Sequence, residues 1–215
     1  MIVIPARLAS TRFKDKILCD IKGMPMFIAT AKNALKVDDV LIAVDDEKVL
    51  KIARKYEFKA IMTDKNHQSG TDRINEAVQN FGIKDDEIII NVQADEPFFE
   101  SENLRKFKDF AARKITSNEA FMASCYKKVS YEDAENPNLV KVVLDKFEMR
   151  YISVARRYHI QERNFTIISD ISAFMPTALK ICANFALLRL LFWKIRKNWN
   201  SFAHSQTLKK SQCAK

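Results

Sequence analysis

Short apolar runs alternate with amphipathic stretches along the first two thirds of this 215-residue chain. The apolar runs are rich in β-branched residues and predict strands at 2–4, 40–44, 60–62, 88–92, 121–125 and 140–144. Between them, apolar residues recur at helical spacing and predict helices at 26–35, 47–56, 71–81 and 102–114. We therefore predict an α/β fold with a mainly parallel, Rossmann-like sheet flanked by helices, and a ligand site at the carboxyl ends of its strands.

The first predicted strand runs into a loop that suits a phosphate group. Pro5 ends the apolar run, and cationic and hydroxyl side chains follow it: Arg7, Ser10, Arg12 and Lys16. Such side chains bind phosphate oxygens together with backbone N–H groups released at a strand end. Because no glycine precedes Gly23, side chains rather than a glycine-rich turn must supply most of the binding. Taken alone, the loop also fits a solvated basic turn.

Three further polar segments adjoin predicted strands. Residues 67–73 read His-Gln-Ser-Gly-Thr-Asp-Arg, and their small side chains let the backbone approach a base or a ribose. Residues 91–97 place Asp95 at the carboxyl end of the most apolar strand, where a carboxylate can hold Mg²⁺ against a triphosphate. Residues 136–143 combine a polar turn with a lysine at the sheet. In isolation, the first two segments also fit a helix-capping loop and a turn with solvated acids.

Charge divides the chain into two unlike parts. The net charge of +9 falls entirely on residues 151–215, which hold eleven basic and two acidic residues, while residues 1–150 are balanced. The four cysteines and three histidines are scattered without metal-binding spacing, which predicts reduced thiols and no zinc site. No apolar run reaches membrane-spanning length, and the start has no signal-peptide layout. These features favour a cytoplasmic protein.

The four polar segments, in this order, resemble one enzyme family closely. Residues 4–16, 67–73, 91–97 and 136–143 are similar to the opening nucleotide loop and to the H-Q-S-G-T-[DE]-R, N-V-Q-G-D-E-P and N-P-N-x-V-K-V-V segments of 3-deoxy-manno-octulosonate (Kdo) cytidylyltransferase, also called CMP-Kdo synthetase. The resemblance covers residues 1–145. One departure is Ala94, where the family has glycine, and we expect its methyl group to crowd the substrate or to shift the backbone.

The resemblance implies a cytoplasmic, Mg²⁺-dependent nucleotidyltransferase that joins CMP from CTP to an acidic eight-carbon sugar for lipopolysaccharide assembly. It implies Lys16, Arg7 and Asp95 as catalytic residues, Asp95 as the metal ligand, and Gln93 beside the sugar. The implied CTP-binding residues are Ala6, Arg7, Ser10, Lys16, Gln68, Ser69, Gly70 and Arg73. It also implies a homodimer with neither nucleic acid nor membrane as partner. Such catalysis rests on alignment and charge neutralisation, without a covalent enzyme intermediate.

Residues 146–215 carry none of the segments that the family has there. When the third base of each codon is read with the first two of the next, synonymous choice permits three of them in order: A-L-Y-F-S-R-A-K-I-P from 149–159, G-H-F-G-I-Y-A-Y from 169–177 and E-K-L-E-Q-L-R-A-L from 196–205. We infer a frameshift between about residues 145 and 149. The chain then divides into a nucleotidyltransferase domain at 1–145 and an aberrant, out-of-frame tail at 146–215, for which we predict poor packing, a lost dimer interface and little or no activity.

Three other functions fit parts of the sequence. A different acidic-sugar cytidylyltransferase, such as one acting on sialic acid, would share the first loop, but residues 67–73 and 91–97 argue against it. A nucleic-acid-binding protein would use the basic tail and its two tryptophans to hold phosphates and stack bases, but a frameshift makes that tail accidental. A non-catalytic nucleotide-binding fragment stays open for the chain as written.

Overall fold

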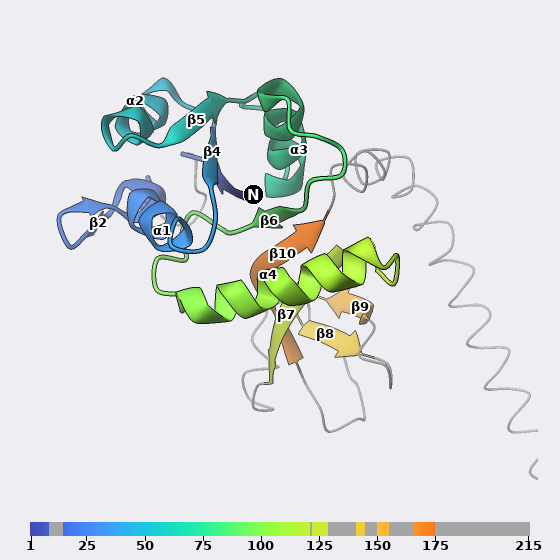
Figure 1. The fold of residues 1–215 in the computed structure, drawn as a ribbon. Coiled ribbons are helices and arrows are strands. Elements are labelled where there is room, and N and C mark those ends of the chain that lie inside the picture. The colour runs from blue at the N-terminus through green and yellow to red at the C-terminus, as the bar shows by residue number, and fades with distance from the viewer. Residues whose placement is uncertain (9–14, 121, 129–140, 145–149, 155–165, 175–215) are drawn as a thin grey trace, which may run out of the picture.

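The central sheet has a parallel half and an antiparallel half (Figure 1). The protein is represented by a computed structural model that describes residues 1–8, 15–120, 122–128, 141–144, 150–154 and 166–174. The strands are β1 (Ile2–Ala6), β2 (Asp20–Ile21), β3 (Met24–Pro25), β4 (Val40–Val44), β5 (Lys59–Met62), β6 (Ile89–Asn91), β7 (Met122–Lys128), β8 (Lys141–Leu144), β9 (Arg150–Val154) and β10 (Thr166–Phe174). The helices are α1 (Met26–Ala34), α2 (Glu47–Lys55), α3 (Gly70–Phe81), α4 (Ser101–Thr116) and the short 3-10 helix η1 (Lys16–Leu18).

The parallel half is built from β5, β4, β1 and β6, in that spatial order. β1 pairs in parallel with β4 on one side and with β6 on the other, and β4 pairs in parallel with β5. Every residue of β1 and β4 is buried, as expected of parallel strands that are covered on both faces. This half confirms the predicted α/β class and the strand–helix alternation.

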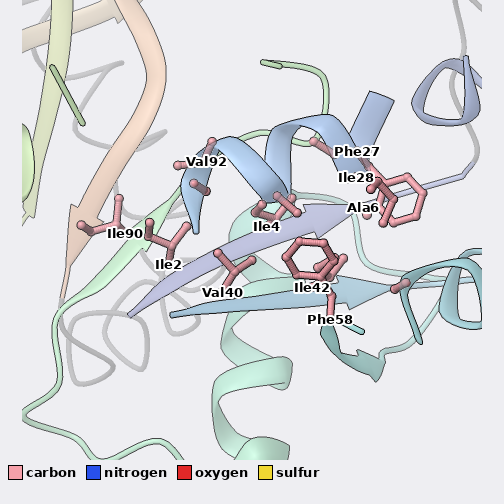
Figure 2. Close-up of a cluster of buried hydrophobic side chains, with 14 of the residues drawn as sticks. Ile2, Ile4, Ala6, Phe27, Ile28, Val40, Ile42, Phe58, Ile90 and Val92 are labelled. Carbon is pink, nitrogen blue, oxygen red and sulfur yellow. The ribbon is translucent and has the colours of Figure 1, made fainter. Parts of the chain in front are cut away.

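The core has two layers because successive residues of a strand point to opposite faces. Ile2 and Ile4 of β1 join a buried cluster with Val40 and Ile42 of β4, packed under α1, α2 and α4 (Figure 2). Val3, between them, joins a second cluster under α3 on the other face. Each fully buried side chain of this size contributes about 1.5–3 kcal/mol to folding. All four helices predicted from apolar spacing are confirmed, with ends shifted by a few residues.

The antiparallel half departs from the sequence prediction. β10 runs antiparallel to β6 and also pairs with β7 and β8, and β8 in turn carries β9. The prediction of a mainly parallel sheet therefore holds for the four strands around β1 but not for the strands after residue 121. β9 and β10 also lie inside 146–215, where we predicted poor packing. Both stretches form strands, and the packing of the tail stays a prediction. Residues 166–174 read Thr-Ile-Ile-Ser-Asp-Ile-Ser-Ala-Phe, and the β-branched and aromatic residues in this stretch favour a strand whichever reading frame encodes them.

A small hairpin that the sequence did not predict follows η1. β2 and β3 have two residues each, which is too short for a periodic signal. Their turn uses Lys22 and Gly23, both at positive φ (52° and 84°), as tight hairpin turns require. The N–H of Met26, at the start of α1, donates to the carbonyl of Cys19 at 2.9 Å, which joins the end of η1 to the start of α1. Within the described part of the chain, no helix is both long and apolar enough to span a membrane.

Candidate active site

Polar segments from distant parts of the chain meet beyond the carboxyl ends of β1 and β6. The Nζ atom of Lys16 lies 2.5 Å from Oδ2 of Asp95, which is 79 residues away in sequence. The two side chains are 45% and 36% exposed, so a ligand can reach both. Their charges are opposite, and each is suited to one part of a metal–triphosphate group. The structure thus brings together the predicted phosphate ligand and the predicted metal ligand.

The loop that carries Asp95 is held in place by a hydrogen bond from α1. Thr30 of α1 donates its hydroxyl to the carbonyl oxygen of Ala94 at 3.0 Å, inside the protein. Ala94 is 4% exposed and its methyl group belongs to the main hydrophobic cluster. It is not among the described residues with positive φ, so the methyl group adds no backbone strain. The expected crowding of a substrate by this methyl group is therefore wrong, because the group packs into the core.

Gly70 lets the start of α3 approach the end of β1. A Cβ atom at Gly70 would lie 3.3 Å from Cγ of Pro5 and 3.9 Å from Nε2 of Gln93. Because glycine has no side chain, three of the polar segments approach one another here: the end of β1, the segment at 67–73 and the segment at 91–97. Gln93 is half-buried, and its amide nitrogen lies 3.4 Å from Oδ1 of Asn91. The predicted sugar-binding residue thus lies close to Gly70, as does Pro5 near the end of β1.

The remaining predicted contacts fall into three groups. Ala6 is buried as the last residue of β1, and Arg7 is exposed just beyond it. Gln68 and Ser69 are both exposed before α3, where the Gln68 amide donates to the carbonyl of Asn66 and the Ser69 hydroxyl accepts from the Asp72 N–H at 3.1 Å as the helix cap. Ser10 lies outside the described residues, as do residues 136–140. For all of these, the CTP contact stays a prediction.

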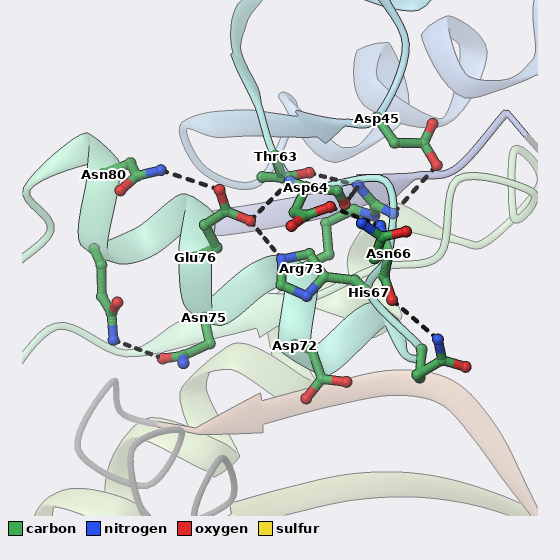
Figure 3. A network of polar contacts seen from close by, with 12 residues as sticks. Asp45, Thr63, Asp64, Asn66, His67, Asp72, Arg73, Asn75, Glu76 and Asn80 are labelled. Carbon is green, nitrogen blue, oxygen red and sulfur yellow. Dashed lines mark hydrogen bonds and ion pairs between the residues drawn. The ribbon is translucent and has the colours of Figure 1, made fainter.

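Arg73 is turned into the protein instead of toward the solvent. Its side chain is one of the largest fully buried ones, and its Nη2 lies 3.2 Å from Oδ2 of Asp45. Its Nη1 donates to the hydroxyl of Thr63 at 2.5 Å and to the carbonyl of Asp64 at 3.2 Å (Figure 3). The nucleoside contact that the resemblance implies stays a prediction, and what the structure shows is an internal ion pair. Burial lowers the pKa of Arg73, the carboxylate of Asp45 raises it, and the positive charge of nearby Arg7 lowers it again.

Two residues of this region were not singled out by the sequence. Asp45 comes directly after β4, so an acid at the carboxyl end of a buried strand was the available signal. Glu76 of α3 pairs with the His67 ring and accepts the N–H of Asp64 at 2.9 Å, which fastens the loop before α3 to the helix (Figure 3). Burial raises the pKa of Glu76, but the hydrogen bonds from Asp64 and His67 together lower it below its usual value.

The donor atoms at this edge suit a hard cation shared with a ligand. Among the described residues, no group of three or more histidine, cysteine and acidic side chains is arranged to hold a metal by itself. Asp95 offers an exposed carboxylate next to Lys16. Magnesium binds through one or two carboxylates plus substrate phosphates rather than in an all-protein cage. The residues present therefore fit a Mg²⁺ ion that arrives with a phosphorylated substrate.

A family model described as cytidylyltransferase matches residues 1–204. The chain belongs to the cytidylyltransferase family. The 3-deoxy-manno-octulosonate cytidylyltransferase of a Nitratiruptor species is 53% identical over 145 residues, which is 67% of this chain and 61% of that relative. The protein of the same name from Helicobacter pylori (strain G27) is 39% identical over 213 residues, covering 90% of this chain and 86% of the relative.

Solved structures place this cytidylyltransferase in the same fold. One described as CMP:2-keto-3-deoxy-manno-octonic acid synthetase complexed with CTP superposes with a TM-score of 0.74 at 30% identity, covering 87% of this chain and 77% of that one. A cytidylyltransferase from Leptospira borgpetersenii serovar Hardjo-bovis has a TM-score of 0.53 at 16% identity, covering 83% of this chain and 61% of that one, and shares the fold.

The relatives match the two parts of the cytidylyltransferase chain unequally. The protein from Helicobacter pylori strain HPAG1 is 48% identical over 145 residues, whereas that from strain G27 is 39% identical over 213. The longer alignment, which extends into the tail, has the lower overall identity. The boundary at residue 145 and the out-of-frame origin of residues 146–215 stay predictions.

Proposed function

We propose that this protein is a CTP-dependent nucleotidyltransferase that makes CMP-Kdo and pyrophosphate from CTP and 3-deoxy-manno-octulosonate, for lipopolysaccharide assembly. The contact between Lys16 and Asp95 is the observation that carries the proposal. The two residues come from separate family segments and are exposed side by side at the sheet edge where α/β folds bind ligands. The names of the relatives and of the CTP complex support the same substrates.

The proposed reaction needs alignment more than it needs covalent chemistry. A hydroxyl oxygen of the sugar forms a bond to the α-phosphorus of CTP, while the bond from that phosphorus to the bridging oxygen breaks. Pyrophosphate leaves with the bonding electron pair, and the hydroxyl proton passes to solvent. Lys16 and Arg7 neutralise charge on the phosphates, and Gln93 orients the sugar against the nucleotide. No covalent enzyme intermediate is required.

We also propose Mg²⁺ as the cofactor, with Asp95 as its protein ligand. When bound, the ion offsets the charge that develops on the phosphate oxygens. The exposed carboxylate of Asp95 supports this role, and Lys16 beside it supplies a further positive charge. We expect the in-frame enzyme to be a cytoplasmic homodimer, with neither nucleic acid nor membrane as partner.

A second function is favoured by one observation, that residues 146–215 lack the family's segments. The chain as written would then bind CTP without completing the transfer.

Pyrophosphate release in the presence of CTP, the sugar and Mg²⁺ tests the first function, and CTP binding measured by calorimetry tests the second. Replacing the eight-carbon sugar by sialic acid distinguishes the proposed substrate from the other acidic sugar, which we expect to be inert.

A further inference from the structure

Asp45 is a buried carboxylate whose partners come from distant segments of the chain. It follows β4 at the carboxyl edge of the parallel half and is 5% exposed. A carboxylate this deeply buried is stable only with a cationic partner and hydrogen bonds to its oxygens. Asp45 has both, and each of its oxygens serves a different segment of the chain.

The two oxygens of Asp45 join the end of β1 to α3. Oδ1 accepts the backbone N–H of Leu8 at 2.9 Å, and Oδ2 pairs with Nη2 of Arg73 at 3.2 Å. Leu8 lies 37 residues before Asp45 and Arg73 lies 28 residues after it. A single side chain therefore fixes the backbone just after Arg7 relative to the helix that begins with Gly70.

The Nη1 atom of Arg73 also has hydrogen-bond partners inside the protein. It donates to the hydroxyl of Thr63, and that hydroxyl donates in turn to the carbonyl oxygen of Val44 at 2.8 Å. Thr63 and Arg73 are 4% and 1% exposed. The polar chain from Leu8 to Val44 is thus buried along its side chains, and such a network has one low-energy arrangement.

The position of Arg7 depends on this network. Arg7 is exposed, and the peptide group that joins it to Leu8 carries the N–H that Asp45 accepts. The charges of Arg7 and Arg73 repel each other, and the Asp45 carboxylate compensates for the second of them. We propose that Asp45 is a positioning residue of the proposed CTP site, because it locks the backbone at Leu8 to α3 and so presents Arg7 to the phosphates in one orientation. This inference rests on the proposed function.

Two substitutions separate the hydrogen bond from the charge. Asp45→Asn keeps an oxygen for Leu8 but places an uncharged group beside Arg73, and Asp45→Glu keeps the charge but moves the carboxylate outward by one methylene. Asp46→Asn is the matched control, because Asp46 is the adjacent acid and caps α2 by accepting the Lys48 N–H at 2.8 Å, which asparagine does equally well.

The experiment combines CTP titration calorimetry of the 215-residue chain with hydrogen exchange of its backbone amides. We expect both Asp45 variants to bind CTP at least tenfold more weakly and to exchange the Leu8 amide faster, with the Ile4 amide of β1 unchanged. The control should differ less than twofold. If Asp45→Asn does not fold, Asp45→Glu carries the test. Unchanged CTP affinity in a folded Asp45 variant, even with a lower melting temperature, overturns the positioning role.

The same data keep this inference apart from the proposed function. If the unaltered chain does not bind CTP, the second proposed function, CTP binding without transfer, fails, and the positioning of a CTP site in this chain fails with it. If the unaltered chain binds CTP and the Asp45 variants bind it equally well, the proposed function stands and the positioning role of Asp45 is wrong.

Discussion

Charged residues at the carboxyl edge of the sheet divide by burial into two kinds. Asp45 and Arg73 are inside the protein, where removing one partner leaves an uncompensated charge and costs about 3–5 kcal/mol. Lys16 and Asp95 are exposed, and a pair of that kind contributes only about 0–1 kcal/mol to stability. Substitutions of the exposed pair therefore test the function of the site with little disturbance of the fold.

We predict that Asp95→Asn and Lys16→Ala each lower the turnover of the in-frame enzyme by roughly a hundredfold or more. The first removes the carboxylate that we propose as the ligand of Mg²⁺, and the second removes the positive charge that we propose to bind phosphate, which no glycine-rich loop can replace. Steady-state pyrophosphate release measures the effect, and a thermal melt checks that the fold is kept. The exposed Asp109 and Lys51, changed to Asn and Ala, serve as controls. Near-normal turnover in Asp95→Asn would refute its role as metal ligand.

At the scale of elements, α3 has a glycine at each end, and the two glycines have different structural roles. Gly70 begins the helix, where an added Cβ would press against Pro5 of β1. Gly82 ends it at φ 74°, with open space around the position of a Cβ. The first glycine therefore matters for packing at the site, whereas the second matters for the backbone conformation of the helix cap.

We predict opposite outcomes for Ala at these two positions. Gly70→Ala should weaken CTP binding several-fold, because the start of α3 and Pro5 of β1 must move apart to admit the added methyl group. Gly82→Ala should leave CTP binding unchanged and lower the free energy of unfolding by about 1 kcal/mol. Calorimetry with CTP and urea denaturation measure the two quantities. Equal losses of CTP affinity in both variants would show that the approach at Gly70 has no special importance.

We expect the contribution of the loop before α3 to the stability of the fold to depend on pH. The pKa of Glu76 is lower in the folded protein than its usual value, and such a carboxyl stabilises the fold above its unfolded pKa, about 4.3. That contribution is lost as the pH falls through the folded pKa. We predict that the free energy of unfolding decreases as the pH is lowered from about 5, and that this decrease is smaller in Glu76→Gln. The variant Glu57→Gln, changed at an exposed residue, should behave as the unaltered chain does. Asp38 and Glu119, whose pKa values are also lowered, leave part of the fall in place. Urea denaturation from about pH 3 to about pH 7 measures this, and parallel curves for both variants would contradict it.

At the scale of the whole molecule, the sequence predicts what is local and misses what depends on distant pairing. Each parallel strand and each helix carries its signal within its own residues, as β1 does in a continuous apolar run. The place of β10 beside β6 depends on pairing between residues 91 and 172, which no local pattern reveals. Likewise, the segment at 67–73 shows a cationic Arg73 but gives no sign that its partner is Asp45 of the same protein.

The most direct test of the account is pyrophosphate release from CTP, 3-deoxy-manno-octulosonate and Mg²⁺, measured for two chains. One is the 215-residue chain as written, and the other has a single base inserted between codons 145 and 149 to restore the family's frame. We predict turnover at a rate typical of enzymes for the in-frame chain. For the chain as written we predict a rate at least about a thousandfold lower, because an out-of-frame tail would leave out the family segments expected after residue 145 and, with them, the contacts that align the sugar. An in-frame chain that forms no CMP-sugar would contradict the proposed function, and a fully active chain as written would contradict the frameshift.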